Sequence, residues 1–119
     1  MVKRNKSELV RLSRQARSLV RAGKYIISEH ALNDHPERDI KIEDILEVLK
    51  IGEAISEEPR EVDGVEIYRG TQRYRWFGED QNDRVLRLIV VIKANVVIIS
   101  AAIATERQAE RYRAEDQED

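Results

Sequence analysis

With 119 residues the chain has the size of a single domain that buries one core, and its 21 lysines and arginines nearly balance its 23 aspartates and glutamates. This balance gives no general reason for attraction to nucleic acid. Because cysteine is absent, disulfides, thiolate catalysis and cysteine-ligated zinc sites are excluded. The sequence lacks a signal-peptide pattern and an apolar run of membrane-spanning length, so we expect a cytoplasmic protein without membrane contact.

Charge is unevenly distributed along the chain. Residues 1–24 carry eight basic side chains against one acid, whereas residues 106–119 carry six acids and three arginines. We therefore divide the sequence into a basic amphipathic helical extension over residues 1–23, a single α+β domain over residues 24–104 and an acidic tail over residues 105–119. The tail begins with a helical pattern, but its last residues have no apolar surface to bury.

The first half of the sequence has helical periodicity. Apolar residues share one arc of a predicted helix over residues 7–22, with Ser7 as N-cap and Gly23 as C-cap. Residues 25–27 form a short extended segment. Ser28 then caps a second short helix that Pro36 ends. A third helix follows, closed by Gly52, and its apolar positions are Ile42, Ile45, Leu46 and Leu49.

The second half changes to strand periodicity. Asp63-Gly64 predicts a two-residue hairpin with strands at about 59–62 and 65–70, and a second hairpin is predicted near residues 79–83. Residues 84–93 are apolar on nearly both faces, so this strand should be central. A last strand over residues 96–104 returns beside it. The sequence thus predicts N-terminal helices packed on a C-terminal antiparallel sheet.

Three motifs carry a resemblance to a known family. They are residues 25–32 (YIISEHAL), residues 37–40 (ERDI) and residues 43–49 (EDILEVL). With them, residues 24–104 resemble the domain-of-unknown-function 4258 family. The resemblance implies a His-Ala helix, a second helix and a curved antiparallel sheet, in a fold akin to the RelE/ParE-type toxins and small metal-independent ribonucleases.

The chain departs from this family pattern at four positions. Asp34 stands where the family usually has an arginine, and Asp39 stands where it has a glycine. Arg87 aligns with a position that is often histidine, and Ser100 aligns with a threonine. Because two of these changes alter a cationic or titrating group, they weaken the transfer of a catalytic role. The basic N-terminal helix is an addition to the family core.

His30 is the first candidate catalytic residue. Imidazole titrates near neutral pH, so it can take a proton from a ribose 2′-hydroxyl or give one to a leaving oxygen. The alternative is a structural histidine at a helix start. A metal pair with His35 is not expected, because five helical positions turn the two rings apart and Pro36 breaks the helix. We expect no metal and no other cofactor.

Arginines are the candidate ligands for phosphate and for a pentacovalent transition state, because they carry planar arrays of donors. Arg38 and Arg87 are assigned to catalysis. Arg87 interrupts a strand that is apolar on both faces, so it needs a partner, which an acidic side chain can also supply. Arg73 and Arg75 share a strand face and are candidate nucleic-acid ligands, with a merely solvated face as the alternative.

The aromatic residues beside these arginines have two interpretations. Tyr74 and Trp76 alternate with Arg73 and Arg75, which suits stacking on unpaired bases. With one tryptophan and one phenylalanine in the chain, however, the core needs large aromatic side chains. We therefore interpret Trp76 as a core residue, and Tyr74 lies on the same strand face.

The first predicted helix carries a stripe of one charge sign. Its arginines suit a phosphate backbone or an acidic partner, and the alternative is the polar side of a structural helix. The stripe consists of Arg11, Arg14, Arg17 and Arg21.

Two functional hypotheses follow. The first is a toxin-like, metal-independent endoribonuclease in which His30 is the acid or base, while Arg38 and Arg87 stabilise charge on phosphorus. It requires the Arg87 side chain to converge with His30 or Arg38 on one concave surface. The second is a catalytically silent interaction module of the same fold, which binds nucleic acid or an acidic protein through the basic helix. The expected partners are RNA and a small acidic, antitoxin-like protein.

Overall fold

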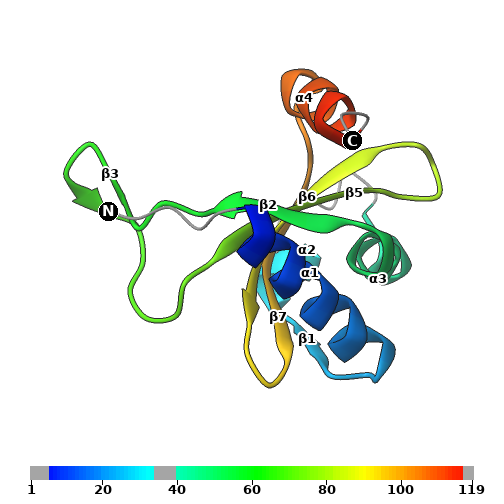
Figure 1. The fold of residues 1–119 in the computed structure, drawn as a ribbon, viewed down its shortest axis with the longest axis horizontal. Coiled ribbons are helices and arrows are strands. Elements are labelled where there is room, and N and C mark those ends of the chain that lie inside the picture. Colours follow the sequence, from blue (N-terminus) through cyan, green and yellow to red (C-terminus); the bar gives the residue numbers. More distant parts are fainter. Residues whose placement is uncertain (1–5, 34–39, 117–119) are drawn as a thin grey trace.

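The computed structural model describes residues 6–33 and 40–116, which form an α+β domain as the sequence predicts (Figure 1). No helix in these two ranges is long and apolar enough to cross a membrane. In chain order the elements are α1 (Lys6–Arg21), β1 (Tyr25–Ile27), α2 (Glu29–Asn33), α3 (Ile42–Ile51), β2 (Glu53–Glu57), β3 (Glu61–Val62), β4 (Val65–Glu66), β5 (Tyr74–Glu79), β6 (Val85–Ile92), β7 (Val96–Ile103) and α4 (Glu106–Asp116).

Gly23 ends α1, which confirms the predicted cap. Its φ of 78° lies in the left-handed region that glycine adopts without strain. The Gly23 N–H donates to the Val20 carbonyl at 3.0 Å, and the Lys24 N–H donates to the Leu19 carbonyl at 2.8 Å. This pair of bonds is the Schellman pattern, which satisfies the last carbonyls of the helix.

The predicted start of α2 is also confirmed. The Ser28 hydroxyl oxygen accepts a hydrogen bond from the Ala31 N–H at 3.1 Å, as an N-cap does. The predicted end of this helix at Pro36 lies outside the described residues.

Gly52 closes α3 as predicted, but its φ of −86° is open to other residues. The need for glycine comes from close packing. A Cβ atom at this position would lie 2.3 Å from the Phe77 carbonyl oxygen and 2.8 Å from Trp76 Nε1. A residue without a side chain therefore allows the chain to pass from α3 into β2 against β5.

The main sheet has the strand order β1-β7-β6-β5-β2. β6 is its middle strand, which confirms the central position predicted for residues 84–93. The prediction of a purely antiparallel sheet is wrong, because β1 pairs in parallel with β7, with Tyr25 opposite Val96 and Ile27 opposite Ile98. Three extended residues carry no pattern that distinguishes parallel from antiparallel pairing, so the sequence did not reveal this edge strand.

β2 is a strand that the sequence analysis missed. Its pairing with β5 shifts register between Ala54 and Ser56, and this bulge interrupts the alternation on which strand prediction depends. The buried Ser13 of α1 binds the backbone of this strand. The Ser13 hydroxyl accepts from the Ala54 N–H at 2.9 Å and donates to the Leu9 carbonyl at 2.7 Å.

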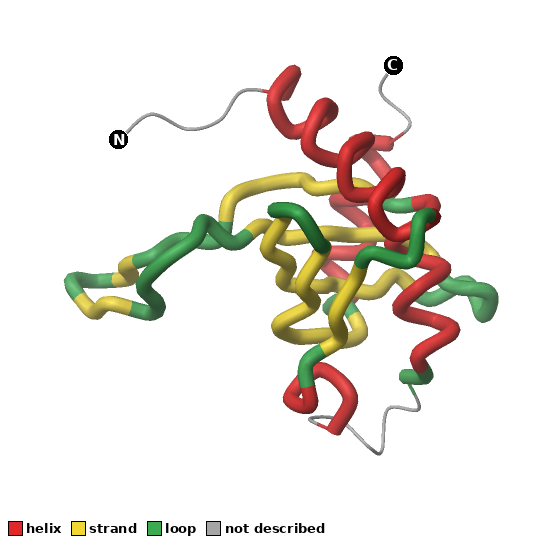
Figure 2. The backbone as a smooth tube through the Cα atoms, turned by 90° about the horizontal axis from the view of Figure 1, so that it is seen from below, coloured by secondary structure: helices red, strands yellow, loops and turns green. Residues whose placement is uncertain are grey.

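Both predicted hairpins are present. Asp63 and Gly64 have φ angles of 51° and 79°, as a type I′ turn requires, and they join β3 to β4. These two strands are shorter than predicted, and Figures 1 and 2 show the hairpin projecting away from the body of the domain. The second hairpin joins β5 to β6.

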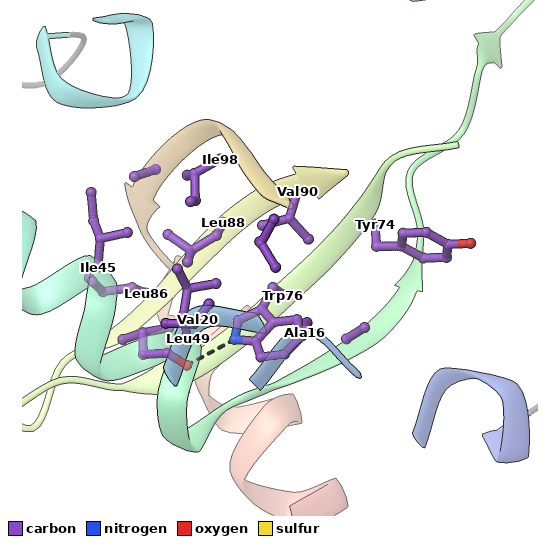
Figure 3. Packing of buried hydrophobic residues seen from close by; sticks show 14 of the residues in the cluster. Ala16, Val20, Ile45, Leu49, Tyr74, Trp76, Leu86, Leu88, Val90 and Ile98 are labelled. Atoms are coloured by element: carbon purple, nitrogen blue, oxygen red, sulfur yellow. Dashed lines mark hydrogen bonds between the residues drawn. The ribbon is translucent and has the colours of Figure 1, made fainter. Parts of the chain in front are cut away.

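The hydrophobic core lies between one face of the sheet and the helices α1, α2 and α3. Trp76 is fully buried there, and its indole N–H donates to the Val48 carbonyl at 2.9 Å (Figure 3). This burial confirms that Trp76 is a core residue, and Tyr74 is buried on the same face. α4 lies on the opposite side of the sheet, where Tyr112 stacks on Phe77 with ring centroids 6.0 Å apart (Figure 1).

Candidate functional site

The face of the sheet opposite the core, which we call the outer face, carries the candidate site. Strand alternation turns Arg75 and Phe77 of β5 to this face, because Tyr74 and Trp76 point into the core. Arg87 of β6 lies directly opposite Phe77 on the neighbouring strand. On the other side Arg87 faces Ala102 of β7. Arg87 therefore occupies the middle of the outer face.

Arg87 is a half-buried cation for which the described part of the chain provides no partner. Its Nε atom is buried, and within residues 6–33 and 40–116 no acceptor lies within hydrogen-bonding distance of it. The acidic partner that the sequence analysis allowed is not found in this part of the chain. Because an unpaired buried guanidinium nitrogen lowers stability, its presence in the middle of a sheet points to an anion that completes it.

A bulge in β7 lies beside the start of α2. The β6–β7 register shifts so that Ser100 pairs with Ile89 and Ile98 pairs with Val90, which leaves Ile99 between them. The Ser28 hydroxyl donates to the Ile99 carbonyl at 3.0 Å. This hydrogen bond fixes the beginning of α2 beside β7, the strand next to β6.

His30 follows Ser28 by two residues and has an exposed side chain. Ala31, the next residue of α2, is buried in the core cluster. Within the described residues no hydrogen bond joins the His30 ring to Arg87. Arg38 and His35 lie outside the described residues. Among the described residues the structure does not show the predicted convergence of Arg87 with His30, because α2 packs on the core side and against β7, whereas Arg87 belongs to the outer face of β6.

The two arginines predicted to bind nucleic acid through the sheet already have protein partners. Arg75 Nε donates to a carboxylate oxygen of Glu58 at 2.6 Å. The Arg73 guanidinium lies over the Tyr68 ring, with its central carbon 4.4 Å from the ring centroid. Tyr68 donates its hydroxyl proton to the Glu58 carbonyl at 2.8 Å, so these contacts form one structural cluster.

The arginine stripe of α1 divides into two kinds of residue. Arg17 is half-buried and donates from Nη1 to the Gly52 carbonyl at 2.8 Å, so it helps to close the end of α3. Arg11, Arg14 and Arg21 are exposed, and no acidic side chain within the described ranges pairs with them. These three, which we call the α1 triad, remain available to an external anion.

A pocket of about 380 Å³ lies between the outer face and α4. No pattern in the sequence predicts this pocket. The signal that was present is the spacing of Thr105 and Gln108, which suits a capping box and fixes the start of α4. The residues that line the pocket are Ile55, Ser56, Arg75, Phe77, Gln108, Arg111 and Tyr112.

Among the described residues there is no group of three or more histidine, aspartate or glutamate side chains arranged to hold a metal ion. The chemistry that the site offers comes from guanidinium, imidazole, amide and aromatic groups.

Comparison with known proteins agrees with this arrangement of elements. The sequence profile of the family described as "Domain of unknown function (DUF4258)" matches residues 27–103, which run from β1 to the end of β7. The chain therefore belongs to the DUF4258 family. The matched range contains His30, Arg38 and Arg87, while α1 and α4 lie outside it. No characterised protein and no solved structure shows a significant match to the chain.

Proposed function

We propose that this DUF4258 domain is a toxin-like, metal-independent endoribonuclease of RelE/ParE-like fold. The observation that supports the proposal is the half-buried Arg87 guanidinium, which has no partner within the described residues. No carboxylate of residues 6–33 and 40–116 forms an ion pair with this group. A phosphodiester anion can accept two charge-assisted hydrogen bonds from an arginine, because two of its oxygens match the donor geometry of the guanidinium.

The proposed reaction is an attack by the ribose 2′ oxygen on the neighbouring phosphorus. A bond forms between the 2′ oxygen and phosphorus while the bond from phosphorus to the 5′ oxygen breaks. The 2′ proton leaves to a base, and the 5′ oxygen receives a proton from an acid or from water. His30 serves as this base or acid, and Arg87, together with Arg38, stabilises the negative charge that develops on phosphorus.

The first test is RNA cleavage by the pure protein in the presence of a chelator. We expect products that end in a 2′,3′-cyclic phosphate and a 5′-hydroxyl. His30→Ala should slow cleavage by at least about 100-fold, because general acid–base catalysis contributes that much or more. Arg87→Gln should have an effect of about 100-fold, the usual result of losing one stabilising donor.

The matched control is Lys50→Gln, which removes one exposed positive charge from α3. This variant should cleave at the rate of the unchanged protein. Cleavage that disappears with the chelator, or that survives in both His30→Ala and Arg87→Gln, contradicts the proposed mechanism.

A second function is favoured by the α1 triad, whose three exposed arginines lack acidic partners within the described residues. In this alternative the domain is a catalytically silent module that uses α1 to bind nucleic acid or an acidic, antitoxin-like protein. Arginines at this spacing present donors along one side of a helix, and a phosphate backbone or an acidic segment provides the matching charge.

For this alternative we predict the behaviour of a triple variant in which Arg11, Arg14 and Arg21 become glutamine. Glutamine preserves helix propensity, and Arg17 is kept because it holds the Gly52 carbonyl. If α1 binds RNA, the affinity should fall, and the slope of log affinity against log salt should shrink by roughly 0.7 to 0.9 for each lost phosphate contact.

The control for this triple variant neutralises three exposed cations elsewhere, namely Lys50, Lys93 and Arg107. Equal salt slopes in the two variants would mean that total charge, and not α1, governs binding. If RNA affinity is unchanged in both while an acidic partner no longer co-purifies with the α1 variant, α1 is a protein-binding helix.

A further inference from the structure

We propose that the pocket between the outer face and α4 binds a guanine base of the RNA. This inference rests on the proposed function for the kind of substrate, and it adds a subsite with its own chemistry. The pocket is lined by two aromatic side chains together with several hydrogen-bond donors. Such a combination of an apolar body and a few convergent polar groups is typical of small-molecule sites.

The aromatic side of the pocket is suited to a flat ligand. Phe77 and Tyr112 stack with an angle of 22° between their rings. Both residues line the pocket. Phe77 is buried, whereas Tyr112 is half-buried. A base that stacks against this pair extends an existing aromatic stack, and each such contact contributes about 1–3 kcal/mol in proteins that bind single strands.

Gln108 supplies a fixed pair of donors. The Gln108 side-chain oxygen accepts from the Thr105 N–H at 3.0 Å. The Gln108 backbone N–H donates to the Thr105 hydroxyl at 3.1 Å. This reciprocal capping box determines which end of the amide carries the oxygen. The side-chain NH₂ group has no acceptor within the described residues, although Gln108 lines the pocket.

The other polar groups of the pocket are mainly donors too. Arg75, whose Nε donates to Glu58, contributes its remaining guanidinium N–H groups, Arg111 contributes a second guanidinium, and Ser56 contributes a hydroxyl that donates or accepts. A ligand edge that presents adjacent acceptors therefore fits best. Guanine presents two acceptors, N7 and O6, side by side, whereas adenine pairs its N7 acceptor with an NH₂ donor that would face the donors of the pocket.

The pocket lies next to Arg87, the residue proposed to bind the phosphate. Phe77 lines the pocket and is also the direct cross-strand neighbour of Arg87. Side chains in such pairs have Cβ atoms about 5 Å apart. A nucleotide whose base lies against Tyr112 thus brings its phosphate towards Arg87. The pocket and the central arginine together define one nucleotide-sized site across β5 and β6.

The test is a titration of the full-length protein with guanosine 5′-monophosphate and, separately, with adenosine 5′-monophosphate, monitored by NMR. The signals to follow are the Gln108 side-chain NH₂ protons and the Tyr112 ring protons. We expect the guanine nucleotide to shift both sets and to bind roughly ten-fold more tightly than the adenine nucleotide, as one bidentate contact provides. Equal affinities, or equal shifts with inorganic phosphate alone, would overturn guanine recognition.

Gln108→Glu is the decisive variant, because glutamate keeps the acceptor that caps α4 and loses the NH₂ donors. The preference for guanine should disappear in this variant. Gln15→Glu, the same change at an exposed position of α1, should retain it. If Gln108→Glu fails to fold, Tyr112→Leu provides the second measurement and should weaken both nucleotides. A guanine preference that survives Gln108→Glu, or affinities that Tyr112→Leu leaves unchanged, contradict the proposed pocket.

This result is separable from that of the ribonuclease assay. Loss of chelator-resistant cleavage with retention of the guanine shifts would remove the catalytic proposal and leave a nucleotide-binding pocket. Intact cleavage without guanine shifts would leave the ribonuclease and remove the pocket.

Discussion

Trp76→Ala is expected to lower the free energy of unfolding by about 3–5 kcal/mol, the range for deleting a large aromatic side chain from a core. The indole is fully buried between the sheet and the helices, and its N–H satisfies the Val48 carbonyl near the end of α3. The alanine variant loses that bond and leaves a cavity. Because domains of this size are stable by only about 5–15 kcal/mol, a measurable unfolded fraction should result. Urea denaturation followed by far-ultraviolet circular dichroism measures the change.

Trp76→Phe separates the two contributions at this position. Phenylalanine refills most of the volume but donates no hydrogen bond to Val48, so the loss should be smaller than for alanine. If both variants unfold at the urea concentration of the unchanged protein, Trp76 does not organise the core in the way described.

Asp80→Ala is expected to have an effect of similar size, about 3–5 kcal/mol, because it breaks a buried charged cluster from one side. The Asp80 side chain is completely buried. It accepts from the backbone N–H groups of Asn82 and Arg84, each at 2.9 Å, and from Arg84 Nε at 2.7 Å. Its removal takes one carboxylate from the half-buried Arg84, which also contacts Asp44 at 3.3 Å. The midpoint of urea unfolding is the appropriate measurement.

Asp80→Asn is the matched variant for this cluster. Its amide oxygen can still accept from the backbone of the turn between β5 and β6, but the charge opposite Arg84 is lost. We therefore expect a destabilisation between that of the unchanged protein and that of Asp80→Ala. Equal destabilisation by the two substitutions would show that the charge, and not the turn, accounts for the whole effect.

Much of the fold follows from local patterns in the sequence. The apolar arc of α1, the Asp63-Gly64 turn and the doubly apolar β6 each have a short-range physical cause, so they are predictable without tertiary information. β1 and β2 have no such short-range signal in the sequence. The pairing of β1 depends on a strand at the far end of the chain, and the bulge of β2 hides its alternation. These two edge strands are specified by tertiary contacts.

The candidate site was predictable in its residue types and less so in its geometry. Arg87 stood out because a cation interrupts an apolar strand, and the structure shows it half-buried and without a partner in the described residues. The roles of Arg17 and Arg73 were not predictable, because the Gly52 carbonyl and the Tyr68 ring that engage them are reached only after folding. The pocket at α4 depends in the same way on a helix that returns to the sheet.

The parallel pairing of β1 with β7 has a consequence for synthesis of the protein. β1 and β7 lie far apart in the sequence, so this edge of the sheet cannot close until β7 has left the ribosome. Contacts of such long sequence separation form late and slow the folding of a domain. Until then Ser28 lacks the Ile99 carbonyl that fixes the start of α2. A nascent chain that stops before β7 therefore lacks the contact that fixes the helix of His30, and this contact forms only after β7 has been synthesised.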